Sequence, residues 1–331
     1  MLTSPRSVTR HRSLAGATLA VLGGLAACSS PNTSGNTNVA CRALTAASPR
    51  PSGWSGTVFT IVMENHSYGD IVGNAAAPYF NGLAAQGTLA AGYHDSYVHP
   101  SEPNYLWMVA GQNFGILNDD DPGPGNIATT TSHLADQLEQ AGMTWKAYQE
   151  NMTQPCGISS GGAYAAKHDP FVYFADINGW DGQALHPGAR CTEHIVDYSQ
   201  LAVDLQGGQV PDYVFITPNL QNDMHDGSVA KGDAWLAAQV PQILASPAYL
   251  NGGALFILWD EGSQDADDPP FLVMSPNARP GYVSQTPYDT SSFLKTVQEV
   301  MGVETLPCGA DAATVPAMDD LFTVPLTAAA L

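Results

Sequence analysis

Short runs of β-branched and aromatic residues recur along the chain, and several stop abruptly at polar residues. Such runs are typical of strands buried on both faces of a sheet. We expect strands at residues 57–63, 143–148, 212–217, 254–259 and 271–274. Helices are expected between and after them, at residues 77–86, 132–141 and 291–301. This alternation predicts an α/β fold, a three-layer α/β/α sandwich with a mainly parallel central sheet.

Two pairs of residues with oxygen-bearing side chains follow predicted strands directly. Glu64 and Asn65 come after the first strand, and Asp260 and Glu261 come after strand 254–259. In parallel sheets, ligands bind beyond the carboxyl ends of the strands. Each pair alone could cap a helix or top a solvated loop. Two pairs at equivalent places in one sheet instead predict that oxygen ligands converge on one hard divalent cation.

Ser101 stands where a helix is expected to begin, because Pro103 is suited to a first helical turn. A serine there lies near free backbone N–H groups and the positive end of the helix dipole, which together attract anions. A plain N-cap serine is the alternative at this point. The chain has no GxSxG motif, so an α/β-hydrolase nucleophile is not indicated.

Two histidines lie beside acids. His225 is flanked by Asp223 and Asp226 in a polar segment beyond strand 212–217, where it could bind metal or transfer a proton. An Asx-rich turn with a solvated histidine is the alternative. His168 precedes an aspartate and gives a weaker signal. It falls within residues 157–189, which we expect, like 118–126, to be a long loop or lid.

The first 28 residues resemble an export signal. Three arginines precede an apolar stretch at 14–27, which is too short for a bilayer span of roughly 20 residues. The stretch ends in Leu-Ala-Ala-Cys, which is similar to a bacterial lipobox and predicts a lipid on Cys28; an ordinary signal peptide is the alternative. Residues 29–52 then read as a flexible tether, and residues 53–331 as the folded domain. We therefore expect an exported protein attached to a membrane only through its N-terminal lipid.

Four cysteines remain besides Cys28, an even number that suggests two disulfides in an oxidising compartment. Three pairings are open. We favour Cys156–Cys191, which closes one loop, and Cys41–Cys308, which ties the two chain ends. No CxxC spacing indicates a structural zinc.

The composition is acidic and poor in bases. The chain has 331 residues, with 11 Lys and Arg against 31 Asp and Glu and a formal net charge of −20. Nucleic-acid binding depends on Lys and Arg contacts to phosphates, so no nucleic-acid partner is expected. Removal of the signal would take three arginines and no acids, leaving eight bases.

Taken in order, these segments resemble the bacterial phosphoesterase family of the alkaline phosphatase superfamily, and most closely its secreted acid phosphatases of mycobacterial type. The matching stretches are 61–67, 99–105, 222–228 with 232–236, and 259–261. The resemblance implies one divalent metal ion, of unknown identity, held by Glu64, Asn65, Ser101, Asp260 and Glu261. It also implies that Ser101 is the nucleophile, forming a phosphoserine with a small phosphomonoester substrate.

The resemblance assigns supporting roles as well. Asn104, His168 and His225 would bind the phosphoryl oxygens or assist the leaving group. Asp223 and Asp226 would orient the histidine or bridge to the substrate site. We expect His225 to be the proton donor, although His168 could exchange roles with it. A histidine common in relatives near the position of Thr290 is absent, so no second metal is expected.

Two other functions stay open. One is a phosphodiesterase of the phospholipase C type, and the other is a surface-binding protein that kept the fold without the chemistry. None of the eight bases falls in the matched stretches. A phosphate dianion would therefore be held by the metal, the helix N-terminus, an amide and histidines, without a basic side chain.

Overall fold

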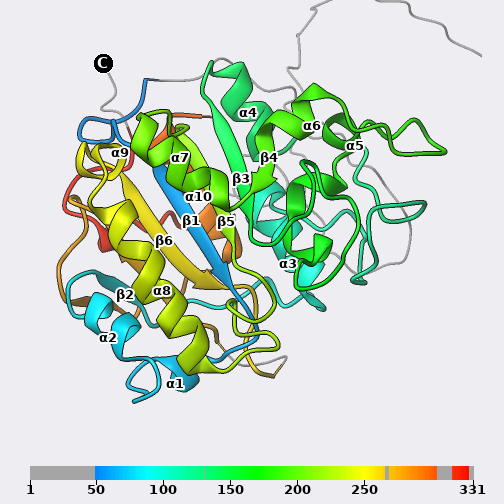
Figure 1. Ribbon diagram of the computed structural model, residues 1–331. Coiled ribbons are helices and arrows are strands. Elements are labelled where there is room, and N and C mark those ends of the chain that lie inside the picture. Colours follow the sequence, from blue (N-terminus) through cyan, green and yellow to red (C-terminus); the bar gives the residue numbers. More distant parts are fainter. Residues whose placement is uncertain (1–48, 131, 265–267, 304–314, 328–331) are drawn as a thin grey trace, which may run out of the picture. The chain divides into compact units, whose positions relative to one another are not determined.

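The structure, a computed structural model, describes residues 49–130, 132–264, 268–303 and 315–327. These residues form one eight-stranded sheet with the strand order β4-β3-β5-β1-β6-β7-β2-β8 (Figure 1). The strands are β1 Val58–Met63, β2 Thr88–Ala90, β3 Trp145–Gln149, β4 Ile195–Asp197, β5 Tyr213–Thr217, β6 Ala254–Trp259, β7 Phe271–Met274 and β8 Tyr282–Ser284. All five predicted strands are present.

The sheet is mainly parallel, as predicted. Its centre is β1, which pairs in parallel with β5 on one side and with β6 on the other. β7 runs antiparallel to both of its neighbours, β6 and β2. The carboxyl ends of β1, β5 and β6 therefore meet at one edge of the sheet (Figure 1).

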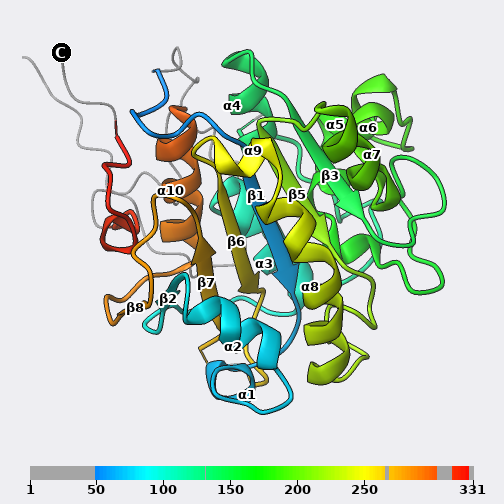
Figure 2. The same cartoon turned by 60° about the vertical axis from the view of Figure 1, so that its left-hand side comes forward.

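Helices cover both faces, which gives the predicted three layers (Figures 1 and 2). Alternate side chains of β1 belong to two separate hydrophobic clusters, with Val62 in one and Ile61 in the other. The first cluster includes side chains of α3 Ser101–Ala110, α4 Leu134–Gln140, α5 Ala175–Asn178 and α10 Thr290–Met301. The second includes side chains of α1 Tyr68–Ile71, α2 Pro78–Ala84, α7 Ser199–Gly207, α8 Val229–Leu244 and α9 Pro247–Leu250. Burial on both faces explains the unbroken apolar runs of the central strands.

Several elements carry no clear sequence signal. Strands β2, β4 and β8 have three residues each, too few to show a period. Helix α8 is the longest described helix with 16 residues, yet it contains Gly232 and Pro241, both of which normally weaken a helical pattern. The segment 157–189, predicted as a loop, also contains short helical turns at Ala166–His168, Pro170–Tyr173 and Ala175–Asn178.

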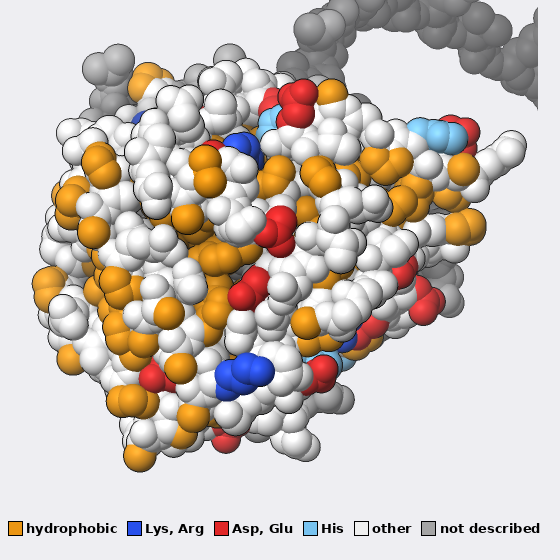
Figure 3. All heavy atoms as spheres, viewed as in Figure 1, with side chains coloured by type: hydrophobic (Ala, Val, Ile, Leu, Met, Phe, Trp, Pro, Cys, Tyr) orange, Lys and Arg blue, Asp and Glu red, His pale blue; other side chains and the backbone are white. Residues whose placement is uncertain are grey.

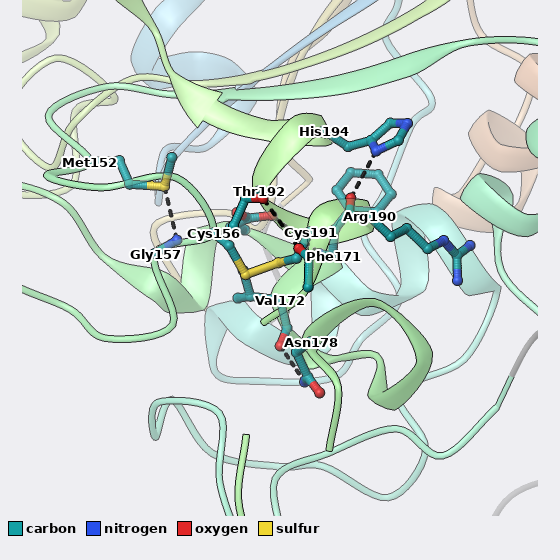
Figure 4. Close-up of a disulfide and its surroundings, with 12 residues drawn as sticks. Met152, Cys156, Gly157, Phe171, Val172, Asn178, Arg190, Cys191, Thr192 and His194 are labelled. Atoms are coloured by element: carbon teal, nitrogen blue, oxygen red, sulfur yellow. Dashed lines mark hydrogen bonds between the residues drawn. A yellow bond between two sulfur atoms is a disulfide. The ribbon is translucent and has the colours of Figure 1, made fainter. Parts of the chain in front are cut away.

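Cys156 and Cys191 form a disulfide, as predicted, with Cα atoms 5.3 Å apart. It ties the segment after β3 to helix α6 Ala189–His194 (Figure 4). The other predicted sites on cysteines, Cys28, Cys41 and Cys308, lie outside the described residues. So do the export signal and most of the tether.

The last tether residues are packed against the domain rather than free. Pro51 is buried, and Arg50 donates hydrogen bonds to the carbonyls of Gly56 and Val300. Lys and Arg are sparse on the face viewed in Figure 3. Within the described ranges, no helix combines the length and apolarity needed to cross a membrane.

Candidate active site

Two buried carboxylates lie at the carboxyl edge of the sheet. Glu64 follows β1 and Asp260 follows β6, and neither side chain is exposed to solvent. Backbone hydrogen bonds continue past the strands, from Asp260 N to Met63 O (3.0 Å) and from Glu64 N to Asp223 O (2.9 Å). The parallel pairing therefore brings the two predicted acidic positions together, as the sequence indicated.

Asn65 adopts a left-handed backbone conformation with φ 52°. Asparagine tolerates this region better than most residues do. The turn directs its backbone N–H to Asp260 Oδ1 at 3.1 Å. Asn65 thus links the two strand ends.

Ser101 is the first residue of α3 and is 2% exposed. Its hydroxyl donates a hydrogen bond to Glu64 Oε2 at 3.2 Å and does not cap the helix, whose N-cap is Pro100. The N-cap alternative for this serine is therefore not what the structure shows. Instead, Ser101 faces the buried carboxylates.

Glu261 is tied to the segment that leads into α3. Its Oε2 lies 2.6 Å from His99 Nδ1 and accepts a hydrogen bond from Asn104 Nδ2 at 3.1 Å. Asn104 is fully buried and also bonds to Val98 O and to the hydroxyl of Ser96. The structure gives Asn104 a positioning role; substrate binding by this amide stays a prediction.

The charges of this cluster are poorly compensated within the protein. Burial raises the pKa of Glu64 well above its usual value, and the negative charges of Asp260 and Asp223 raise it further. Burial and the neighbouring Glu261 likewise raise the pKa of Asp260. Asp260 Oδ2 is buried without a hydrogen-bond partner. Oxygen donors that repel each other when ionised, one of them with an unused lone pair, fit a hard divalent cation.

His168 is buried beside Glu64, with Nε2 3.1 Å from Glu64 Oε1. Its other nitrogen, Nδ1, lies 3.3 Å from Asp223 Oδ2. The ring stacks on Tyr105 with centroids 5.2 Å apart, and the Tyr105 hydroxyl donates to Glu64 Oε1 at 2.6 Å. Burial and the positive charge of Lys167 lower the pKa of His168 well below its usual value, so this histidine is neutral.

His225 is oriented by both predicted aspartates. Asp223 Oδ1 accepts a hydrogen bond from the backbone N–H of His225 at 2.8 Å, and Asp226 Oδ1 lies 2.8 Å from its Nδ1. The His225 ring lies 5.6 Å from that of His168. Ligand atoms of Glu64, His168 and His225 all lie within 4.8 Å of one another. The two predicted histidines, His168 and His225, therefore lie together beside the predicted carboxylate Glu64.

The loop that carries His225 is held by contacts with the end of β3 and with α8. Glu150, just after β3, accepts hydrogen bonds from Asn222 Nδ2 and from Trp235 Nε1. Gly227 and Gly232 allow close contacts, because a Cβ atom would collide with the Gln221 carbonyl in one case and with the Met224 side chain in the other. The 222–236 stretch is thus shaped to hold this loop against α8.

Two site residues were missed in the sequence. Lys167 Nζ lies 3.3 Å from His225 Nε2, and it forms an ion pair with Asp119 Oδ2 at 2.8 Å. A basic side chain therefore lies beside a predicted site residue, although none of the bases falls in the matched stretches. The available signal was the position of Lys167 directly before His168. Asp119, in the loop 118–126, gave no signal of its own.

The sequence of the chain is similar to that of known proteins. The sequence profile of the Phosphoesterase family matches residues 73–268, more than half of the chain. The chain belongs to the Phosphoesterase family. A phosphatidylinositol-3-phosphatase from Mycobacterium tuberculosis is 32% identical over 267 residues, which cover 80% of this chain and 82% of that protein. The expected phosphate-ester hydrolase is confirmed at this level.

Other relatives are more distant. An acid phosphatase from Aspergillus fumigatus is 28% identical over 270 residues, which cover 76% of this chain but only 57% of that protein. Among solved structures, a protein of the alkaline phosphatase superfamily from Vibrio parahaemolyticus aligns with a TM-score of 0.53 at 12% identity, covering 82% of this chain and 74% of that one. This likeness confirms the alkaline phosphatase-like fold.

Proposed function

We propose that the protein is an exported, metal-dependent phosphomonoesterase, an acid phosphatase, that works through a phosphoserine on Ser101. The observation that carries this proposal is the contact of the Ser101 hydroxyl with Glu64 among buried carboxylates of raised pKa. A serine in a plain structural role has no need of such surroundings. The acid phosphatases and the phosphatidylinositol phosphatase among the relatives support the same substrate class.

The metal would be held by Glu64, Asn65, Ser101, Asp260 and Glu261. When bound, a divalent cation there would lower the pKa of the serine hydroxyl and balance the charge that develops on the phosphoryl oxygens. We propose one ion because the ligands that follow β1 and β6 form one group.

The chain's own residues account for the proton transfers. Ser101 Oγ attacks phosphorus, the bond to the leaving oxygen breaks, and the hydroxyl proton moves toward Glu64 Oε2, to which it already points. His225 is proposed to donate a proton to the leaving alcohol. Water then attacks phosphorus and the bond from phosphorus to Ser101 Oγ breaks. His225 takes a proton from the water, and the proton held at Glu64 returns to Oγ.

The role of His225 depends on its neighbour. A lysine ammonium has no lone pair, so His225 Nε2 can only accept from Lys167 in this structure, while Nδ1 faces Asp226. To act as the donor, His225 must gain a proton on Nε2. Because imidazole is protonated at acid pH, this role predicts an acid optimum.

The decisive experiment replaces Ser101 with Ala in the full chain. We expect kcat for a phosphomonoester to fall by at least about 10³-fold, with melting behaviour and metal content retained. Ser246→Ala is the matched control, because Ser246 is also a buried serine at a helix start, where its hydroxyl caps α9. Near-normal turnover by Ser101→Ala would overturn the nucleophile.

A phosphodiesterase of the phospholipase C type is the second candidate. A non-hemolytic phospholipase C from Burkholderia pseudomallei is 28% identical over 223 residues, which cover 60% of this chain and 31% of that protein. A parallel assay of a phosphomonoester and a phosphocholine diester separates the two. Binding without turnover of either ester would favour a catalytically silent surface protein.

We also propose that Cys28 carries the lipid that attaches the exported protein to a membrane. Expression of wild type and Cys28→Ala in a bacterial host with labelled palmitate tests this directly. Label in wild type alone supports the anchor. Equal labelling, or none in either protein, would leave export by an ordinary signal peptide as the better description.

A further inference from the structure

Lys167 lies between the histidines and the nucleophile helix. It belongs to the helical turn Ala166–His168, and its side chain is 17% exposed, so it is largely buried but still reaches solvent. One bond of its ammonium goes to Asp119 Oδ2 (2.8 Å) and another to His225 Nε2 (3.3 Å). These two bonds use two of its three hydrogens.

Asp119 connects this ammonium to the start of α3. Its other oxygen, Oδ1, accepts a hydrogen bond from the backbone N–H of Glu102 at 3.1 Å. Glu102 directly follows Ser101, so one carboxylate fixes Lys167 to the first turn that presents the nucleophile. On its other side, Lys167 touches His225, which lies with His168 and Glu64 in one cluster.

The other bases bond elsewhere. Within the described ranges, six further Lys and Arg side chains bond to or face groups outside this cluster: Arg50, Lys146, Arg190, Lys231, Arg279 and Lys295. Among the bases that the structure describes, Lys167 is therefore the one at the acidic site.

The charge of Lys167 is well maintained. Burial alone would lower its pKa, but the hydrogen bond that it donates to Asp119 and the charges of Glu64, Asp119 and Asp260 together raise the pKa above its usual value. The ammonium thus stays protonated throughout the acid and neutral range. A fixed positive charge that lies beside His225 and is linked through Asp119 to the turn carrying Ser101 is suited to bind a phosphoryl dianion.

We propose that Lys167 binds a non-bridging phosphoryl oxygen of the substrate and that Asp119 is the positioning residue that aims it. This inference rests on the proposed function and narrows its substrate class. A phosphomonoester dianion carries two negative charges where a diester carries one, so a fixed ammonium favours the monoester. Lys167 therefore contributes to selection of monoesters over diesters.

The test compares Lys167→Met and Lys167→Arg with wild type, using a soluble aryl phosphomonoester, its methyl diester, and inorganic phosphate as inhibitor. Lys146→Met is the matched control, because Lys146 has a similar ion pair with Asp204 (2.7 Å) at the start of β3. For Lys167→Met we expect at least a tenfold rise in KM and in the inhibition constant of phosphate. We also expect the monoester-to-diester ratio of kcat/KM to fall at least tenfold. Lys167→Arg should restore part of each loss.

Each outcome decides between the possibilities. Unchanged phosphate inhibition and ester ratio in a folded, active Lys167→Met would overturn the inference and leave the phosphatase intact. A wild-type protein that hydrolyses no monoester would overturn the proposed function, and this inference with it. Should Lys167→Met fail to fold, Asp119→Asn serves instead: it retains the lysine, and we expect several-fold weaker phosphate inhibition. No change there would overturn the positioning role.

Discussion

Glu64, His168 and His225 form one cluster of histidine and carboxylate side chains, and His133, Asp136 and Asp176 form another. In the second cluster, His133 Nε2 lies 3.1 Å from Asp136 and 3.2 Å from Asp176. Arg190 bonds to both aspartates at 2.7 Å and to Glu139 at 3.0 Å. A guanidinium therefore fills the second cluster. The first cluster has the single ammonium of Lys167, which lies at its rim beside His225, and among the described residues no arginine bonds to it.

The difference appears in the acids. Burial raises the pKa of Asp176, but the bonds from His133 and Arg190 outweigh it and bring the pKa below its ordinary value. At Asp136 burial prevails and raises the pKa to about 6, although His133 and Arg190 act against it. At Glu64 and Asp260, burial and neighbouring acids act in the same direction and raise the pKa. A cluster compensated from within stabilises the fold. One that lacks a matching charge is prepared for a ligand that brings it.

The sharpest way to break this comparison is Asp260→Asn. We expect kcat/KM for a monoester to fall by about 10³-fold, because a proposed ligand is lost. The metal-free variant should melt no lower than wild type, since one of several mutually repelling carboxylates is gone. Asp204→Asn, at another buried acid, should instead retain activity and lose stability with its Lys146 partner. A clear fall in the melting temperature of metal-free Asp260→Asn would contradict this view.

Divalent cations distinguish the clusters directly. At about 100 times the dissociation constant, a bound ion stabilises the native state by about 2.7 kcal/mol. That corresponds to several degrees in melting temperature, measured by scanning calorimetry with and without Mg²⁺, Mn²⁺, Ca²⁺ or Zn²⁺. We expect the shift to disappear in Asp260→Asn and to persist in Asp136→Asn. Loss of the shift in Asp136→Asn would place the ion in the cluster of His133, Asp136 and Asp176. Full activity of the chelated protein would refute the proposed metal centre.

Arg190→Met tests the other side of the comparison. It leaves Asp136, Asp176 and Glu139 without their shared cation, which we expect to cost about 2 kcal/mol of unfolding free energy, reduced from the fully buried case because Arg190 is partly exposed. KM and kcat should change little at temperatures where the variant is folded. Urea denaturation and steady-state kinetics measure the two effects. A variant that is stable but inactive would assign the second cluster to catalysis.

A smaller effect concerns pH. Asp169 is fully buried, and burial raises its pKa from 3.8 to about 8. The folded-state pKa is the higher one, so the native protein holds this proton more tightly than the unfolded chain does. The contribution of Asp169 to the free energy of unfolding is therefore fully present below pH about 4. It is lost as the pH rises through about 8, by at most about 1.4 kcal/mol per pH unit. Asp169→Asn should flatten the stability profile between these values. A profile as steep as that of wild type would assign the slope to other groups.

The sequence was most informative where local pattern and sheet geometry agree. Glu64 and Asp260 could be predicted because each follows a buried apolar strand, and parallel strands bring such positions to one edge. The helix that starts at Ser101 was likewise indicated by Pro103. These signals depend only on neighbours in the chain.

The remaining features depend on contacts between distant segments. Asp119 and Lys167 meet across 48 residues, and no period or motif marks the pair. The short edge strands form because partners are present, and α8 forms despite Gly232 because that glycine lets it pack on Met224. Sequence reasoning therefore found the carboxylates and missed the cation beside them.

We expect the disulfide to make the candidate site sensitive to the redox state of its surroundings. Cys156 and Cys191 are 35 positions apart in the sequence. The loop that they close carries both Lys167 and His168, whereas Glu64, Ser101 and Asp260 lie outside it. Under the proposed roles, the disulfide would anchor the segment that supplies Lys167 and His168 to the substrate site. We expect a reductant titration to raise KM before circular dichroism records any loss of the sheet; simultaneous loss of both would contradict this. The enzyme would then reach its full affinity for phosphate only in an oxidising compartment. In a reducing compartment the protein would be folded but would have little activity.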